Sequence, residues 1–267
     1  MAQFLAEKAA KSPLAFRNRG GEITRLEALS DGTFAFAITL LVVSLEVPAT
    51  FTELLGAMRG FLAFAICFTM IVWIWFQHTR FFRRYGLEDA ATVALNGVLL
   101  FVVLFYVYPL KFLWTLLVNG FTGGMRELKP GAEPPLYAAQ APQLMTIYAL
   151  GFLAIFWSLA LLYVRAYAKR KALHLNDLEV FDTKAGIYEN FGVGSVGLLS
   201  IAIVTIGGPR YSAWAGMCYA LIGVVKAGHG YWHGSTRARM EMEFLARAEA
   251  VTAPKAGAAA AAPSPGL

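Results

Sequence analysis

Residues 25–48 read RLEALSDGTFAFAITLLVVSLEVP, and this segment decides the fold class. Fourteen uncharged residues separate Asp31 from Glu46, a run of about 21 Å at the ~1.5 Å rise of an α-helix. The hydrocarbon core of a bilayer is roughly 30 Å thick, so a lipid-facing helix of this kind would draw carboxylates into lipid at a cost of several kcal/mol each. We therefore expect a central membrane helix that is shielded by its neighbours or borders water.

The rest of the chain also has the composition of a membrane protein. Its hydrophobic content is 58% and its mean hydropathy +0.55, both too high for an ordinary soluble domain. Further membrane-length runs occupy residues 60–79, 90–110, 144–164, 190–209 and 211–232. We predict an all-α integral membrane protein of the cell (inner) membrane with six transmembrane helices. Its parts are a basic cytoplasmic lead-in (1–24), the six-helix domain (25–240) and a low-complexity, disordered cytoplasmic tail (241–267).

The distribution of basic residues predicts the orientation of these helices. The net charge is +6, and most Lys and Arg residues precede helix one, follow helices two and six, or separate helices four and five. Cytoplasmic loops carry such an excess, which places both termini in the cytoplasm. The same rule accounts for the positive charge without a nucleic-acid partner. No apolar segment near the N-terminus resembles a cleavable signal.

Periodicity places a mixed set of residues on one face of the first helix. Gly32, Phe36, Thr39, Val43 and Glu46 follow one another at steps of four and three residues. From the cytoplasmic end outward, these five positions carry a small residue, a bulky apolar residue, a hydroxyl group, a second apolar residue and a carboxylate. A narrow water path could use each of these properties. A buried helix with incidental polar residues is the alternative.

Other motifs have structural interpretations. Residues 192–197 match GxGxxG but lie within an apolar span, which favours close helix packing over a dinucleotide site. His229 and His233 are spaced for metal chelation but have no third ligand at a suitable offset, so we interpret them as interfacial. Cys67 and Cys218 are predicted to be packing residues. We find no catalytic constellation and expect no enzyme activity, cofactor or resident metal.

Two connections are predicted from composition. Helix three is expected to end at Tyr108-Pro109, and the Pro- and Gly-containing residues 111–143 to form an irregular outer loop. A charged inner connection, which includes Lys169 to Lys184, is expected to be solvated; the alternative is a sensor of ligand or pH, since it carries both charge signs and His174.

Several of these residues together resemble a known family. The matching positions of helix one are Arg25, Ser30-Asp31-Gly32, Phe34-Ala35 and Ile38-Thr39-Leu40-Leu41. They resemble the R…FSDG-x-FA…TLL signature of the endosomal and lysosomal potassium channel family, and of its single-repeat prokaryotic homologues in particular. Trp75, His78 and Phe82 look like that family's helix-two ending, and Asn96 with Tyr108-Pro109 like its third helix. The resemblance covers helices one to three well and the others by helix count.

The resemblance implies a homotetrameric, potassium-preferring cation channel without a TVGYG filter, which the sequence indeed lacks. Helix one would line a central pore, with Phe36 as the hydrophobic gate and Thr39 as a selectivity residue. Potassium would be the permeant ion, and the partners would be the bilayer and monovalent cations. A polar network would brace the pore helix through Arg25, Ser30, Asp31, His78 and Asn96.

The chain departs from the family pattern at three places; the first change is mild, and the second and third affect conductance and selectivity more than family membership. Leu29 replaces the signature Phe, Phe36 stands where Ile or Leu is usual, and Ser44 replaces a common acidic residue while Glu46 supplies a carboxylate. The alternatives are a secondary transporter, which usually shows internal repeats that this chain lacks, and a non-conducting structural membrane protein.

Overall fold

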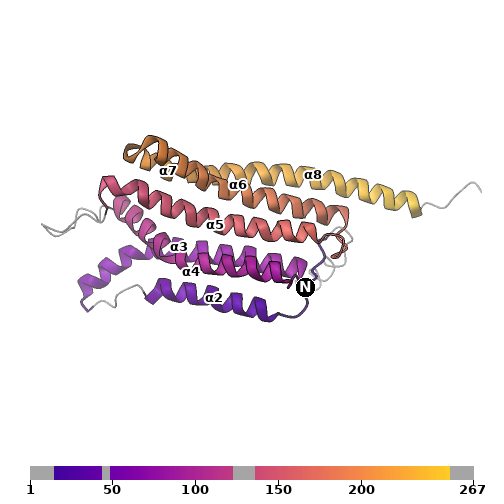
Figure 1. Cartoon of the computed structure of the whole chain (residues 1–267), viewed down its shortest axis with the longest axis horizontal. Helices are drawn as coiled ribbons and strands as arrows, with labels where there is room; N and C mark the ends of the chain where they lie inside the picture. The colour runs from indigo at the N-terminus through magenta and orange to yellow at the C-terminus, as the bar shows by residue number, and fades with distance from the viewer. Residues whose placement is uncertain (1–14, 44–48, 123–135, 253–267) are drawn as a thin grey trace, which may run out of the picture.

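A computed structural model describes residues 15–43, 49–122 and 136–252, and within them all regular secondary structure is helical. Six long helices lie side by side along the longest axis of the molecule (Figure 1). They are α2 (Arg25–Val43), α3 (Phe51–Tyr85), α4 (Ala90–Thr122), α5 (Ala141–Ala168), α6 (Asp177–Gly207) and α8 (Leu221–Thr252). Short elements connect them, namely η2 (Ala138–Gln140), η3 (Pro209–Tyr211), α7 (Ser212–Met217) and η4 (Cys218–Ala220). The all-α prediction is confirmed.

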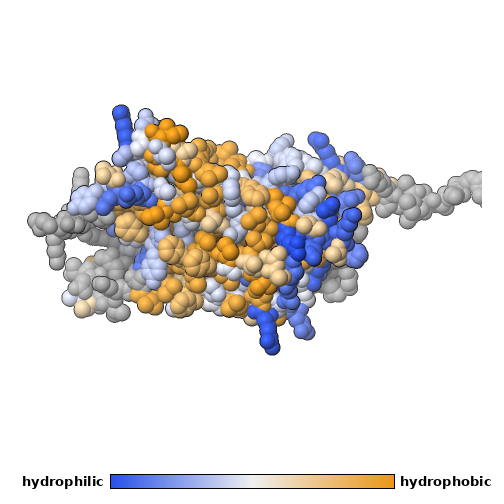
Figure 2. Space-filling view, viewed as in Figure 1, coloured by the Kyte–Doolittle hydropathy of each residue, from blue (hydrophilic) through white to orange (hydrophobic). Residues whose placement is uncertain are grey.

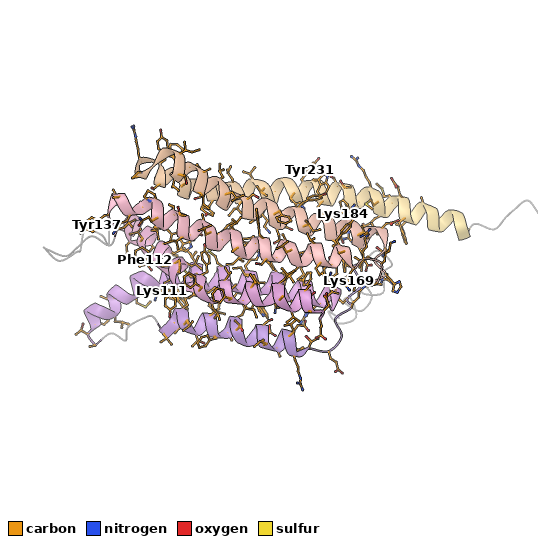
Figure 3. The ribbon with its side chains drawn as sticks, in the orientation of Figure 1. Lys111, Phe112, Tyr137, Lys169, Lys184 and Tyr231 are labelled. Atoms are coloured by element: carbon orange, nitrogen blue, oxygen red, sulfur yellow. The ribbon has the colours of Figure 1, made fainter. Side chains whose placement is uncertain are left out.

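Five of these helices, α2 to α6, are long and apolar enough to cross a membrane. Apolar side chains cover the middle of the molecule, and polar ones gather mainly at the end from which α8 projects (Figure 2). The side-chain view shows Lys169 and Lys184 toward that end and Lys111 toward the other (Figure 3). Among the described residues, α8 is the long helix that is too polar along its length to join the five, because it carries charges such as Lys226 and Arg237.

α4 and α6 extend well beyond their predicted bounds. α4 continues through Pro109 to Thr122, so much of the predicted irregular loop is helical and residues 123–135 lie outside the described part. Packing of α4 against α3 and α5 outweighs the roughly 3 kcal/mol cost of an interior proline. α6 begins at Asp177 rather than near Asn190, since Asn176 and Glu179 form a capping box with N···O distances of 2.8 and 3.0 Å.

The last predicted span is interrupted. Instead of one helix over 211–232, α7 gives way to η4 before α8 begins. The Ala215 carbonyl accepts hydrogen bonds from Ser200 Oγ (3.1 Å) and Cys218 Sγ (3.0 Å), and such side-chain competition for a backbone acceptor favours a locally tightened turn. α8 also continues past residue 240, where we expected the membrane domain to end. Residues 241–252 are therefore helical rather than disordered.

The inner connection is more ordered than expected. Glu179 is 1% exposed and receives the Arg19 guanidinium at 2.6 Å, and Asp182 and Thr183 are also buried. Asp89, at the start of α4, pairs with Arg165 of α5. That guanidinium, with the Thr92 hydroxyl, holds the pKa of Asp89 below its usual value. The prediction of a solvated connection is therefore wrong for Glu179, Asp182 and Thr183 in the first turns of α6, whereas Asp177 and Lys184 are exposed.

The GxGxxG segment packs α6 closely against α5. A Cβ atom on Gly194 would lie 2.6 Å from the Trp157 ring, and one on Gly197 would lie 2.8 Å from the backbone oxygen of Ala149. α5 and α6 make the most extensive helix–helix contact in the described chain. Glycine allows this approach because it has no side chain to separate the backbones, so the packing interpretation of the motif is confirmed.

Replacing Gly197 with valine is expected to destabilise the α5–α6 pair by about 1–3 kcal/mol or more, because a backbone atom cannot move aside as a side chain can. Gly223, where an added Cβ meets nothing within 4 Å, provides the matched control when replaced by valine. Thermal unfolding of both purified variants in detergent measures the difference. Equal melting temperatures would contradict this packing role.

Candidate pore-lining helix and its polar support

The first helix, α2, begins with a capping box. The Glu27 amide donates to Thr24 Oγ1 (3.2 Å), and the Thr24 amide donates to the Glu27 carboxylate (3.1 Å). This T-x-x-E arrangement satisfies backbone donors that the first turn leaves unpaired, which fixes the start of the helix at Arg25. Every later position on α2 is set by this start.

One side of α2 packs against the rest of the chain. Ser30, Phe34, Ala37 and Leu41 are at most 2% exposed, and α2 makes its main contacts with α3 and α4. Steps of four, three and four residues keep these four side chains on one face. This face fixes the rotation of the helix about its own axis.

The opposite side holds the sequence-predicted pore face. Gly32 and Thr39 are exposed, and Phe36 and Val43 are 55% and 72% exposed. Glu46, the outermost predicted member, lies outside the described residues. Of the five candidate spans, α2 has the smallest buried share, 22%. The described part of the chain therefore leaves the predicted pore face of α2 uncovered.

The Thr39 hydroxyl has a defined orientation. Its hydrogen is donated to the Ala35 carbonyl, with an Oγ1···O distance of 2.9 Å. A hydroxyl has one donor and two acceptor lone pairs, so this bond occupies the hydrogen and leaves the lone pairs available. The exposed oxygen can therefore serve a cation as a ligand.

Three predicted network residues form a hydrogen-bonded chain in the interior. Asn96 Nδ2 donates to Ser30 Oγ at 2.9 Å, and Ser30 donates its own proton to the Leu26 carbonyl at 2.8 Å. Asn96 thus turns Oδ1 toward His78, whose Nε2 lies 2.8 Å away and must carry the proton. Ser30 and Asn96 are fully buried and His78 is 1% exposed, so the chain joins α2, α3 and α4 away from water.

The other two predicted network residues lie outside this chain. Asp31 is exposed and accepts a hydrogen bond from Trp75 Nε1 at 2.7 Å. Arg25 is also exposed and has no hydrogen bond or ion pair with any residue that the structure describes. Asp31 is therefore held to α3 by the Trp75 indole rather than by an arginine. No sequence pattern predicts that Asp31 and Trp75 are partners.

Replacing Asn96 with leucine is expected to destabilise the fold, because Ser30 and His78 would each lose a buried partner. An orphaned buried polar group costs about 1–3 kcal/mol. Thermal unfolding of detergent-solubilised protein measures the loss. Thr69→Val is the matched control, since the Thr69 hydroxyl is exposed and bonds only within α3 (2.8 Å). If the melting temperature of Asn96→Leu is no lower than that of Thr69→Val, Asn96 does not brace the helix.

Sequence reasoning missed a second polar cluster, which joins α6 to α8. His233 Nε2 lies 2.8 Å from Asp182, and His229 Nδ1 lies 3.9 Å from Glu189. The histidines are therefore placed against carboxylates of another helix instead of being simply interfacial. Among the described residues, no group of three or more His, Cys, Asp or Glu side chains is arranged to hold a metal ion.

Comparison with known proteins identifies the family. A model of the endosomal/lysosomal potassium channel TMEM175 matches residues 25–106, which include α2, α3 and the first half of α4. A potassium channel of Marivirga tractuosa is 44% identical over 211 residues, which are 77% of this chain and 85% of that protein. The chain belongs to the TMEM175 family.

Solved structures of TMEM175 proteins share the fold. A variant of the potassium channel MtTMEM175, crystallised with a nanobody fusion protein, matches with a TM-score of 0.72 and 40% identity over 82% of this chain and 97% of the other. A homologue of the lysosomal potassium-selective channel TMEM175, from Chamaesiphon minutus, matches with a TM-score of 0.51 and 26% identity over 77% of this chain and 96% of the other. The predicted family is confirmed, and membership in a family of channels confirms that the chain is not an enzyme.

Proposed function

We propose that this TMEM175 protein is a potassium channel in which four copies of α2 surround a central pore. One observation carries the proposal: the face with Phe36 and Thr39 is uncovered, while the opposite face of the same helix is buried. A helix so arranged can be covered by its counterparts in other subunits. The potassium channels among its relatives support the choice of ion.

Phe36 is proposed as the gate. Four phenylalanine side chains on the axis would form an apolar constriction that excludes water and therefore ions. Opening requires the pore helices to rotate or spread until water wets the ring. The polar chain of Ser30, Asn96 and His78 would hold each pore helix at a fixed rotation while it is closed.

Thr39 is proposed as the selectivity residue. Its four hydroxyl oxygens, with lone pairs free, would replace part of the hydration shell of a permeating cation. Potassium holds its water less tightly than sodium, so weak hydroxyl ligands favour it. Gly32 and Val43 would line the pore to either side, and Glu46 would attract cations at the outer mouth.

The proposed orientation places both termini in the cytoplasm of a bacterial cell, with the protein in the cell (inner) membrane. Arg80, Arg83 and Arg84 end the apolar part of α3 at the end of the bundle where α6 begins. An excess of basic residues is typical of the cytoplasmic side.

Thiol accessibility tests whether the uncovered face lines a water-filled path. A membrane-impermeant, positively charged thiosulfonate is expected to abolish potassium current through the Val43→Cys channel in a planar bilayer. The native Cys67 and Cys218 are buried, so the new thiol is the reactive one. Phe101→Cys, exposed on α4, is the control and should keep its current. Loss of current in the control alone would place the pore elsewhere.

A further inference from the structure

A cavity of about 220 Å³ lies among α3, α5, α6 and α8, away from the proposed pore face. α3 supplies Gln77, Arg80 and Arg84 to its wall, and Tyr163 of α5 also lines it. α8 provides four charged or titratable side chains at helical spacing, namely Lys226, His229, His233 and Arg237. The cavity sits at the end of the bundle where the arginines of α3 follow its apolar part, and in the proposed orientation lipid head groups would lie at this level.

The charges around this cavity do not balance. Four permanent cations line it, namely Arg80, Arg84, Lys226 and Arg237, against the two carboxylates Asp182 and Glu189. The net charge of the lining is therefore +2 with both histidines neutral. An excess of like charge in a partly enclosed space raises the local concentration of counter-ions.

Both carboxylates are engaged by α8. Asp182 pairs with Arg237 and His233, and Glu189 pairs with Lys226. Lys226 also lies 4.7 Å from the centroid of the Trp73 ring of α3, which draws α8 toward that wall. The ion pairs therefore neutralise both carboxylates on the α6–α8 side of the cavity.

The α3 side keeps its positive charge. Arg80 and Arg84 have no carboxylate within 4.0 Å among the residues that the structure describes, and the Arg84 guanidinium stacks over the Phe16 ring at 4.7 Å. Guanidinium groups present several N–H donors in a planar fork that matches phosphate oxygens. The excess charge is therefore carried by the side chains best suited to bind a phosphoryl group.

Two further polar groups in the wall lack partners. His229 Nε2 is buried and has no hydrogen bond, and the side chain of Gln77, a residue that is 8% exposed, makes none with any described residue. Buried polar groups in native proteins are almost always paired, so the unpaired His229 Nε2 in this cationic cavity indicates a missing acceptor. A phosphate oxygen would satisfy both.

We propose that this cavity binds a phosphoryl group, from an anionic phospholipid head group or from free inorganic phosphate. Arg80 and Arg84 neutralise the anion, and His229 and Gln77 donate to its oxygens. Occupancy would link α3, which supports the pore helix, to α8. The assignment stands apart from conduction, since binding can be measured without current.

Binding measurements on the purified, delipidated full chain test the assignment. Phosphatidylglycerol and, separately, inorganic phosphate are titrated, with phosphatidylcholine as the neutral comparison, and bound lipid is counted by native mass spectrometry. Arg80→Gln with Arg84→Gln should weaken binding at least about tenfold, because charge-assisted hydrogen bonds to the anion are lost. Arg83→Gln is the matched control, since Arg83 lies on the same turn but does not line the cavity.

The outcomes separate the sources and the alternatives. If the double variant loses binding of phosphatidylglycerol while Arg83→Gln keeps it, the cavity is a lipid site. If the double variant loses binding of inorganic phosphate, and the unmodified chain does not prefer phosphatidylglycerol to phosphatidylcholine, the cavity is a site for the free ion. Equal loss in Arg83→Gln would mean general surface attraction and would overturn the proposal, as would unchanged binding in the double variant. The single Arg80→Gln variant repeats the test at an exposed residue, where the substitution is expected to leave the stability of the fold unchanged.

Discussion

The Phe36→Ala channel is expected to carry a basal potassium current at least about tenfold larger than the unmodified channel, a factor that corresponds to a barrier lower by about 1.4 kcal/mol. The apolar constriction proposed at Phe36 blocks ions by excluding water, so removing four aromatic rings widens the path and lets water remain in it. Phe36 is 55% exposed in the single chain, so its truncation removes little packing within the subunit. The increase can therefore be assigned to the pore and not to misfolding.

Single-channel recording from protein in planar bilayers measures this effect as open probability and unitary conductance. Val42→Ala is the matched control, because Val42 is also exposed on α2 but lies six residues, or about 120°, around the helix from Phe36. An unchanged current in Phe36→Ala would remove this residue from the gate. An equal increase in both variants would point to loosened packing of α2 and away from a specific constriction.

Replacing Thr39 with valine is expected to lower the permeability ratio of potassium to sodium at least about threefold, toward unity. Valine keeps the shape of threonine but removes the oxygen, so a passing cation would lose a ligand without a change in pore width. The hydroxyl bonds to the Ala35 carbonyl within the same helix, and its loss leaves no other side chain unpaired. Stability should consequently change little.

Bi-ionic reversal potentials on protein in liposome-derived bilayers provide the measurement. Thr33→Val is the control: its hydroxyl makes the same kind of bond to the Leu29 carbonyl (2.8 Å), and it lies about 120° around the helix from Thr39. A reversal potential that shifts equally in the two variants would show that selectivity does not depend on the proposed ring. No shift in Thr39→Val would exclude Thr39 from the selectivity site.

The elements of the fold were predictable where a local pattern sets them. Apolar runs of membrane length must form helices, since backbone groups in lipid have no other partners. Five of the six predicted runs form helices that are long and apolar enough to span, and the sixth is divided among α7, η4 and α8. Helix ends were predicted less well. Pro109 is typical of a helix end, but α4 continues through it because the helix is packed on both sides of the proline. Asn190 is typical of the start of a span, but the Asn176 cap begins α6 earlier.

The candidate site divides in the same way. Gly32, Phe36, Thr39 and Val43 share a face by helical periodicity alone, and the structure leaves that face uncovered. The partners of the polar residues could not be read from the chain, because a hydrogen bond between residues far apart in sequence depends on how helices rotate and slide against one another. Asn96 thus bridges Ser30 and His78, while Asp31 bonds to Trp75 and Arg25 has no partner among the described residues.

The amino-acid sequence by itself determined that this protein is an all-helical membrane protein of the TMEM175 family. It also determined which residues share the predicted pore face of α2. These properties depend on composition, periodicity and a short signature, all of which are local. Only the tertiary structure decided which carboxylates are neutralised and which arginines are left without a carboxylate, because the charge balance depends on side chains from α3, α6 and α8 meeting in one place. The cationic cavity beside Arg80 and Arg84 is consequently visible only after folding.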